Sequence, residues 1–182
     1  LAIGVNGMGE GMDRMSHGMG AIVARNAISL IGVGHKSFNQ FFWDGKVGLG
    51  DDGNIYSQLG TDLSNKFSNA LAVAAVMPLL ERDELIGTSN ANNDISKAVD
   101  EKLYNDKFNA VSGVIVNKFK NNGPGTKEIN ELAQSLGIEE MDLKTIGEHL
   151  GIFIANEFKC SESLFDKYLA GDAALTDTQK RG

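Results

Sequence analysis

Beyond residue 60, the apolar residues of this chain recur every three or four positions, and no stretch there alternates convincingly with a period of two. A spacing of three to four places apolar side chains on one face of a helix, whereas a spacing of two is typical of a half-buried strand. The pattern therefore predicts an all-α fold, organised as a single-domain multi-helix bundle. With 182 residues, the chain is long enough for one sizeable core and short for two independent domains.

The clearest predicted helix spans residues 93–120 and is capped by Asn93 or Asp94. A second, at residues 62–86, contains the segment ALAVAAVMPLL, which is apolar on most sides and predicts a central buried helix. Pro78 is expected to kink this helix or to start a new one. Three further helices are predicted near residues 126–136, 140–159 and 161–170. The helix at 140–159 is expected to bury the stripe formed by Leu143, Ile146, Leu150, Phe153 and Phe158.

The first 60 residues differ from the rest, because they are rich in glycine and methionine. We therefore divide the chain into a helical and loop segment at 1–60, a candidate interaction region, and a helical core at 61–182, within one domain overall. Each internal glycine costs a helix about 1 kcal/mol. A helix in the first segment is thus expected to form against a partner surface, either its own core or another chain. The candidate interaction residues are Met8, Met12, Met15 and Met19, which share one helical face, and Phe41, Phe42 and Trp43.

The stretch DGKVGLGDDGNIYSQLG, at residues 44–60, resembles a calcium loop at first sight. With Gly53 at position six of an EF-hand loop, however, Gly48, Gly50 and Leu59 occupy positions one, three and twelve, which need oxygen ligands. Asp-Gly is a good hairpin turn, since glycine tolerates positive φ. The stretch therefore predicts a small hairpin or ordered loop, and no metal site is assigned.

A helix-turn-helix pattern spans residues 129–151, with Ala133, Gly137 and Leu143 at the spacing that such units need. The exposed face of its second helix carries four acidic residues and one lysine, which phosphate groups would repel. A plain antiparallel helix pair is therefore favoured over a DNA reader, and nucleic acid is not the expected partner.

Residues with catalytic chemistry are scattered along the chain. The histidines at 17, 35 and 149 lack metal-ligand spacing, and GVGHKS at 32–37 matches neither a Walker loop nor a G-x-S-x-G elbow. The residues assign no cofactor. Two places stay open for a catalytic site: His149 with Cys160, and Asp51 with Asp52.

The overall composition narrows the classes of function. The net charge is −7, and no run reaches the roughly 18 apolar residues that a spanning helix needs, so no transmembrane segment is predicted. One cysteine allows no internal disulfide, which favours a soluble, disulfide-free protein and fits a reducing compartment. The start at Leu1 indicates a processed product, a fragment of something longer, or a chain whose first residues are not included.

Together these features favour a non-catalytic helical protein that serves as a structural or interaction subunit, as a processed piece of a larger assembly. A protein partner or self-association is expected. The alternatives are a helix-turn-helix DNA-binding protein and an α-helical enzyme without a recognisable local motif; the residues favour a non-catalytic role over an enzyme.

Overall fold

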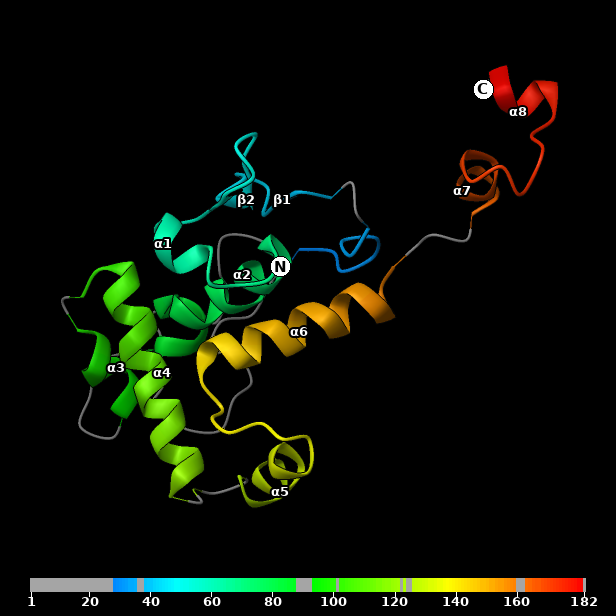
Figure 1. The fold of residues 1–182 in the computed structure, drawn as a ribbon. Coiled ribbons are helices and arrows are strands. Elements are labelled where there is room, and N and C mark those ends of the chain that lie inside the picture. Colours follow the sequence, from blue (N-terminus) through cyan, green and yellow to red (C-terminus); the bar gives the residue numbers. More distant parts are fainter. Residues whose placement is uncertain are drawn as a thin grey trace.

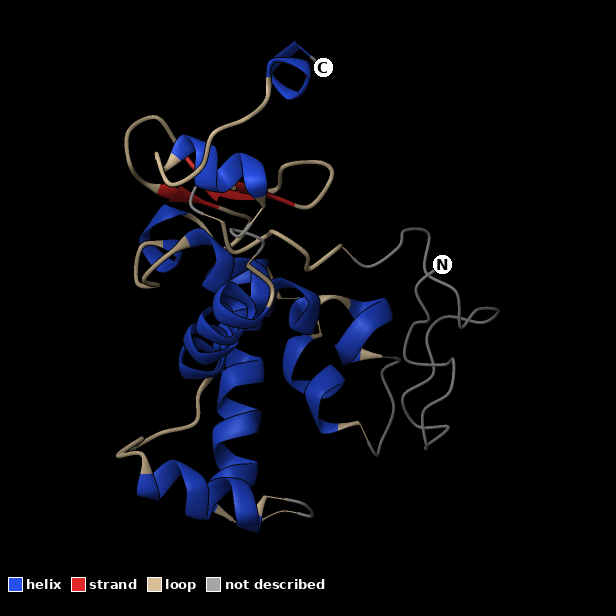
Figure 2. Ribbon diagram, turned by 90° about the vertical axis from the view of Figure 1, so that its right-hand side faces the viewer, coloured by secondary structure: helices blue, strands red, loops and turns tan. Residues whose placement is uncertain are grey.

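A computed structural model describes residues 28–35, 38–87, 93–100, 102–121, 123, 126–159 and 163–181. This part of the chain is mostly helical, as the apolar spacing predicts, but it also contains a three-stranded sheet. The sheet lies at one end of the helical part and α5 (Lys127–Ser135) at the other (Figures 1 and 2). The all-α prediction is thus confirmed as a mostly helical fold, and a multi-helix bundle stays a prediction.

The sheet is antiparallel, with the strand order β1-β2-β3. Leu49 pairs with Ile55 across the turn that contains Asp52 and Gly53. Gly53 has a φ of +77°, and the backbone N–H of Asn54 donates to Asp52 Oδ1 at 3.0 Å. The predicted hairpin is therefore confirmed. The strands span Gln40–Phe41, Val47–Leu49 and Ile55–Tyr56.

The long helix predicted at 62–86 is divided into several pieces. Asn69 takes an extended conformation and its side chain accepts from the backbone N–H of Ala72, which starts α2 anew. Pro78 lies near the start of a 3-10 helix, as its missing N–H favours. The pieces are α1 (Thr61–Ser64), α2 (Ala70–Val76), a 3-10 helix (Met77–Leu80) and a π-helical turn (Arg82–Ile86).

The helix predicted at 93–120 is also divided. Asn93 caps its start, as predicted, but Asp100 has a ψ of 131°, which ends the first piece. The two pieces are α3 (Asp94–Val99) and α4 (Tyr104–Lys120). The remaining helices are α5 (Lys127–Ser135), α6 (Leu143–Glu157), α7 (Leu164–Leu169) and α8 (Asp177–Arg181). In the described residues, no helix is both long and apolar enough to cross a membrane.

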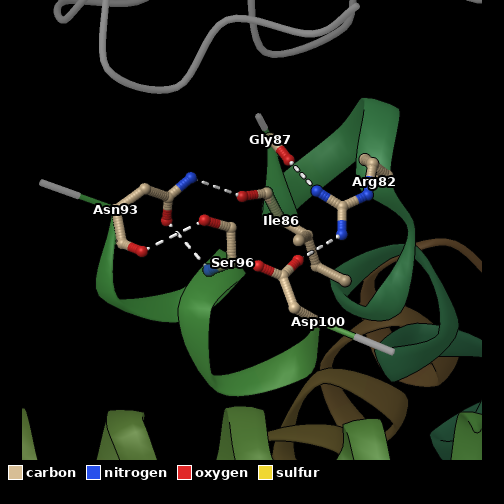
Figure 3. Close-up of polar contacts among 6 residues, drawn as sticks. All are labelled: Arg82, Ile86, Gly87, Asn93, Ser96 and Asp100. Carbon is tan, nitrogen blue, oxygen red and sulfur yellow. Dashed lines mark hydrogen bonds and ion pairs between the residues drawn. The ribbon is translucent and has the colours of Figure 1, made fainter. Parts of the chain in front are cut away.

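A group of polar contacts joins the π-helical turn to α3 (Figure 3). Buried Asn93 donates from Nδ2 to the carbonyl of Ile86 at 2.8 Å and accepts from the N–H of Ser96 at 3.0 Å. Arg82 donates to the carbonyl of Gly87 at 2.9 Å and to Asp100 Oδ1 at 3.0 Å. The bonds of Asn93 and Ser96 satisfy buried polar groups, and those of Arg82 add contacts nearer the surface, so the cluster holds two short elements together.

The core is centred on α2, which packs closely against α6. The buried face of α6 includes Gly147 and Gly151, whose missing side chains let the α2 backbone approach. Leu143 is fully buried, as predicted, whereas Leu150 and Phe153 are 39% and 54% exposed. The predicted stripe is wrong at these two positions, because the small residues and not the large ones face α2. Beyond the C-terminal end of α6, α7 and α8 extend away from the helical part (Figure 1).

Candidate functional site

A pocket of about 770 Å³ lies between residues 33–35, 38 and 39, the hairpin, the start of α2 and the C-terminal half of α6. We call it the α2–α6 pocket. Its volume is in the range that small-molecule and cofactor sites occupy. Its apolar walls include Val33, Phe38, Phe41, Ile55, Phe67 and Leu71.

The polar side chains of the α2–α6 pocket are mostly amides. Among the described residues that line it, His35 is the one titratable side chain. The amides are Asn39, Asn54, Asn65, Asn69 and Asn156. A lining of this kind suits a ligand that is largely apolar and carries hydrogen-bonding groups at one edge.

Two of these asparagines also hold the pocket walls in place. Asn65 accepts from the N–H of Ile55 at 2.8 Å and donates to Asn54 Oδ1 at 2.9 Å, which ties the hairpin to the end of α1. Asn69 accepts from the N–H of Ala72 at 2.9 Å and so fixes the start of α2. The walls are therefore preorganised by hydrogen bonds within and between elements that are neighbours in the sequence.

The loop that carries His35 lies directly against α6. The N–H of Gly32 donates to the carbonyl of Phe158 at 2.7 Å. A Cβ added at Gly34 would overlap the Cα of Ala155, so a side chain at position 34 would push the loop away from α6. Glycine at this position thus allows the close approach that brings half-buried His35 to the pocket.

Ser68, at the pocket edge, is bonded to Glu148 of α6. The Ser68 N–H donates to Glu148 Oε1 at 2.8 Å, and the Ser68 hydroxyl donates to Oε2. Burial alone would raise the pKa of Glu148, but the bonds from Ser68 and the charge of Lys144 outweigh it and hold the pKa below its usual value. The ionised carboxylate of Glu148 therefore links α6 to Ser68, the residue just before Asn69.

The aromatic residues predicted for association lie in three different environments. Phe41 is 3% exposed in the core, and Phe42 is half-buried with Lys46 Nζ 4.6 Å from its ring centre. Trp43 is 78% exposed. Met8, Met12, Met15 and Met19 lie outside the described residues. A role in association stays a prediction for this set.

Among the residues considered for catalysis, those that the structure describes do not line the α2–α6 pocket. Asp51 and Asp52 are exposed in the hairpin turn, where hydrogen bonds from Asn54 lower the pKa of Asp52. His149 is exposed on α6 and does not line the pocket, while Cys160 lies outside the described residues. Across the described part, no three His, Cys, Asp or Glu side chains gather as a metal-ligand set.

The helix-turn-helix pattern corresponds to α5, the turn at Gly137 and α6. Gly137 has a φ of +71° and ends α5, as the predicted turn requires. Ala133 is buried, but three large apolar residues of the same region are exposed: Ile129, Leu132 and Leu136. The predicted first helix, turn and second helix follow one another in the structure. The described residues leave most of the apolar side chains of α5 exposed.

Sequence reasoning missed the residues of the pocket itself. The segment GVGH at 32–35 is the local signal, since it has glycines on both sides of Val33 and ends in a histidine. No period or motif connects it to the asparagines of the pocket, because these come from several separate elements that the fold brings together.

The model of one protein family, the di-haem cytochrome c peroxidases, matches residues 5–174 of the chain. The match extends over much more than half of its length. No curated protein and no solved structure matches the chain significantly.

This match overturns the function predicted from the sequence. The family is a catalytic redox family, so the interpretation as a non-catalytic structural or interaction subunit is wrong, and the alternative of a helix-turn-helix DNA-binding protein does not agree with it either. That interpretation rested on the glycine- and methionine-rich first segment, and no local catalytic motif in the sequence opposed it.

Proposed function

Because the chain belongs to the di-haem cytochrome c peroxidase family, we propose that it is a haem-binding redox protein and that haem binds in the α2–α6 pocket. The family match over residues 5–174 carries the proposal. Bound haem supplies one-electron chemistry and the activation of peroxide. The residues of this chain would bind it, orient it and control its contact with water.

The side chains that line the α2–α6 pocket are suited to binding one haem. Histidine is a common ligand of haem iron, and His35 is the histidine among the described lining residues. The aromatic and aliphatic walls would cover a flat apolar ring, and the covering of the ring by apolar side chains tunes its reduction potential. The asparagines offer donors and acceptors to the polar edge of such a ligand.

A second site that could bind haem is less well supported among the described residues. A second pocket of about 500 Å³ lies between the start of α1 and α4. The residues around it include Asp62, Lys66 and Asn105, but no histidine, methionine, cysteine or tyrosine among those described. Its donor set does not fit haem iron. The described part therefore fits one haem rather than two.

The chain also does not fit covalent attachment of haem. Attachment of the c type uses the motif Cys-x-x-Cys-His, which needs two cysteines for each haem. Residues 1–182 contain one cysteine. The proposed site is therefore one in which pocket side chains, and not thioether bonds, hold the haem.

A titration with haemin tests the proposal. We expect the purified chain to bind about one equivalent, with a shift of the main haem absorbance band. His35→Ala is expected to weaken binding by at least about tenfold, since it removes the proposed iron ligand. His149→Ala is the matched control, because His149 is exposed on α6 outside the pocket, and its titration should equal that of the parent chain.

The activity is measured on the loaded protein as peroxide-dependent oxidation of reduced cytochrome c. We expect turnover in the parent and in His149→Ala, and a large loss in His35→Ala. Binding that is equal in all three proteins would contradict the assignment of His35, and no binding in any of them would contradict the proposed function.

A further inference from the structure

Covalent haem attachment makes strict demands on the residues before a histidine. Each thiol adds across a vinyl group of the haem: an S–C bond forms, the thiol proton moves to the other vinyl carbon, and no oxidant is consumed. The motif places the two cysteines four residues and one residue before the histidine that binds the iron. Both positions can be checked for every histidine of the chain.

None of the three histidines has cysteine at either position. The residues four and one before His17 are Asp13 and Ser16. Those before His35 are Ile31 and Gly34, and those before His149 are Thr145 and Glu148. The single cysteine, Cys160, is not followed by a histidine anywhere in residues 161–182.

The structure adds a steric reason at His35, the histidine of the pocket. Position 34 would have to carry one of the two thiols, but a Cβ there would overlap the Cα of Ala155 and lie 2.9 Å from its carbonyl oxygen. Both contacts are with backbone atoms of α6, which cannot rotate away as a side chain can. The loop therefore cannot pack this closely against α6 and also carry an attachment cysteine at position 34.

At His149, the corresponding position is occupied by a residue with another role. Glu148 accepts hydrogen bonds from the backbone and the side chain of Ser68, and it lies 3.6 Å from Lys144 Nζ. His149 itself is exposed and outside the α2–α6 pocket. Neither described histidine is therefore in a setting that could accept a thioether-linked haem.

We infer that residues 1–182 form no covalent bond to haem, so that any haem in the α2–α6 pocket is bound reversibly and leaves when the chain unfolds. The inference rests on the proposed function for the presence of haem. The absence of the bond rests on the cysteine content and on the packing of Gly34.

The test expresses the 182-residue chain in cells that also produce the enzymes of c-type haem attachment. A c-type cytochrome made in the same cells is the positive control for these enzymes. The purified chain is denatured in acidified organic solvent, and haem is measured in the extract and on the precipitated chain. Intact mass is recorded for the denatured chain.

We expect all haem in the extract and a denatured mass equal to that of the polypeptide alone, close to 19.5 kDa. A mass raised by one haem, with haem retained on the denatured chain, would overturn the inference. Cys160→Ser then identifies the bond, since its loss in this variant would assign attachment to a single thioether at Cys160.

The two proposals fail in different ways. Haem in neither fraction, with an unmodified mass, contradicts the proposed function but agrees with the absence of a covalent bond. Haem retained on the denatured chain overturns the inference and leaves haem binding intact.

Discussion

Helix α2 is apolar throughout and α5 carries large apolar side chains among polar ones, but the protein buries those of α2 and leaves those of α5 exposed. Six of the residues of α2 are buried, whereas Ala133 is the buried residue of α5. Ile129 and Leu132 of α5, and Leu136 directly after it, are between 43% and 63% exposed. The apolar character of a single side chain therefore does not decide whether it is buried here.

The difference lies in the surface that each helix meets. Ala72 of α2 faces Gly147 and Gly151 of α6, and the missing side chains let the two backbones come close. Close packing of this kind gains dispersion contacts over the whole crossing. No surface of similar fit covers α5 among the described residues. Burial follows from the complementarity of two elements, which the pattern of one element does not encode.

The largest expected effect comes from a pair of leucines, one buried in the core at the start of α6 and one exposed on α5. Leu143→Ala, at a fully buried position, is expected to lower the free energy of unfolding by about 2–5 kcal/mol, because it leaves a cavity in the core. Leu132→Ala, at a position 58% exposed, should change it by less than about 0.5 kcal/mol. Urea denaturation followed by circular dichroism measures both, and equal losses would mean that α5 is covered in solution.

A second pair compares glycines on two helices. A Cβ at Gly147 would lie 2.7 Å from Val76 Cγ1 and 2.8 Å from the carbonyl oxygen of Ala72, so Gly147→Ala is expected to cost about 1–3 kcal/mol through overpacking. Gly113 of α4 has nothing within 4 Å of an added Cβ. Gly113→Ala should therefore stabilise the chain by about 0.5–1 kcal/mol. Thermal unfolding of the two variants should shift in opposite directions; a shift upward for both would show that α2 and α6 are not tightly packed.

The sequence predicts most of the elements but little of their packing. The hairpin at 44–60, the cap at Asn93 and the turn at Gly137 are local signals, and the structure confirms them. The break at Asn69 was missed, because its cap competes with a strongly apolar run that continues on both sides. The buried face of α6 was assigned to large residues, since a glycine contributes nothing to a hydrophobic stripe.

The candidate site was harder to predict for the same reason. The α2–α6 pocket takes single residues from several elements, among them His35, Asn54 and Asn69, which share no spacing in the sequence. Gly34 has no side chain and can therefore pack against the backbone of Ala155, which lies 121 residues away in the sequence. Only a tertiary arrangement makes these residues neighbours, so a local motif could not reveal them.

The smallest expected effect concerns the hydrogen bonds that join Ser68, just before α2, to Glu148 of α6. The pKa of Glu148 lies below its usual value of 4.5 in the folded chain. The unfolded chain thus takes up the proton first as the pH falls. The stabilisation is fully present above the usual pKa and is lost as the pH falls through the lower, folded pKa.

Ser68→Ala removes the hydroxyl that donates to Glu148 and leaves the backbone donor in place. We expect it to lower the free energy of unfolding by about 1 kcal/mol at pH 7. The difference from the parent should shrink as Glu148 becomes protonated in acid. Ser135→Ala is the control, because the Ser135 hydroxyl donates to the carbonyl of Leu132, which does not titrate, and its effect should not vary with pH. Parallel stability curves for the parent and Ser68→Ala between pH 7 and pH 3 would show that the charge of Glu148 does not help to hold α6 against the start of α2.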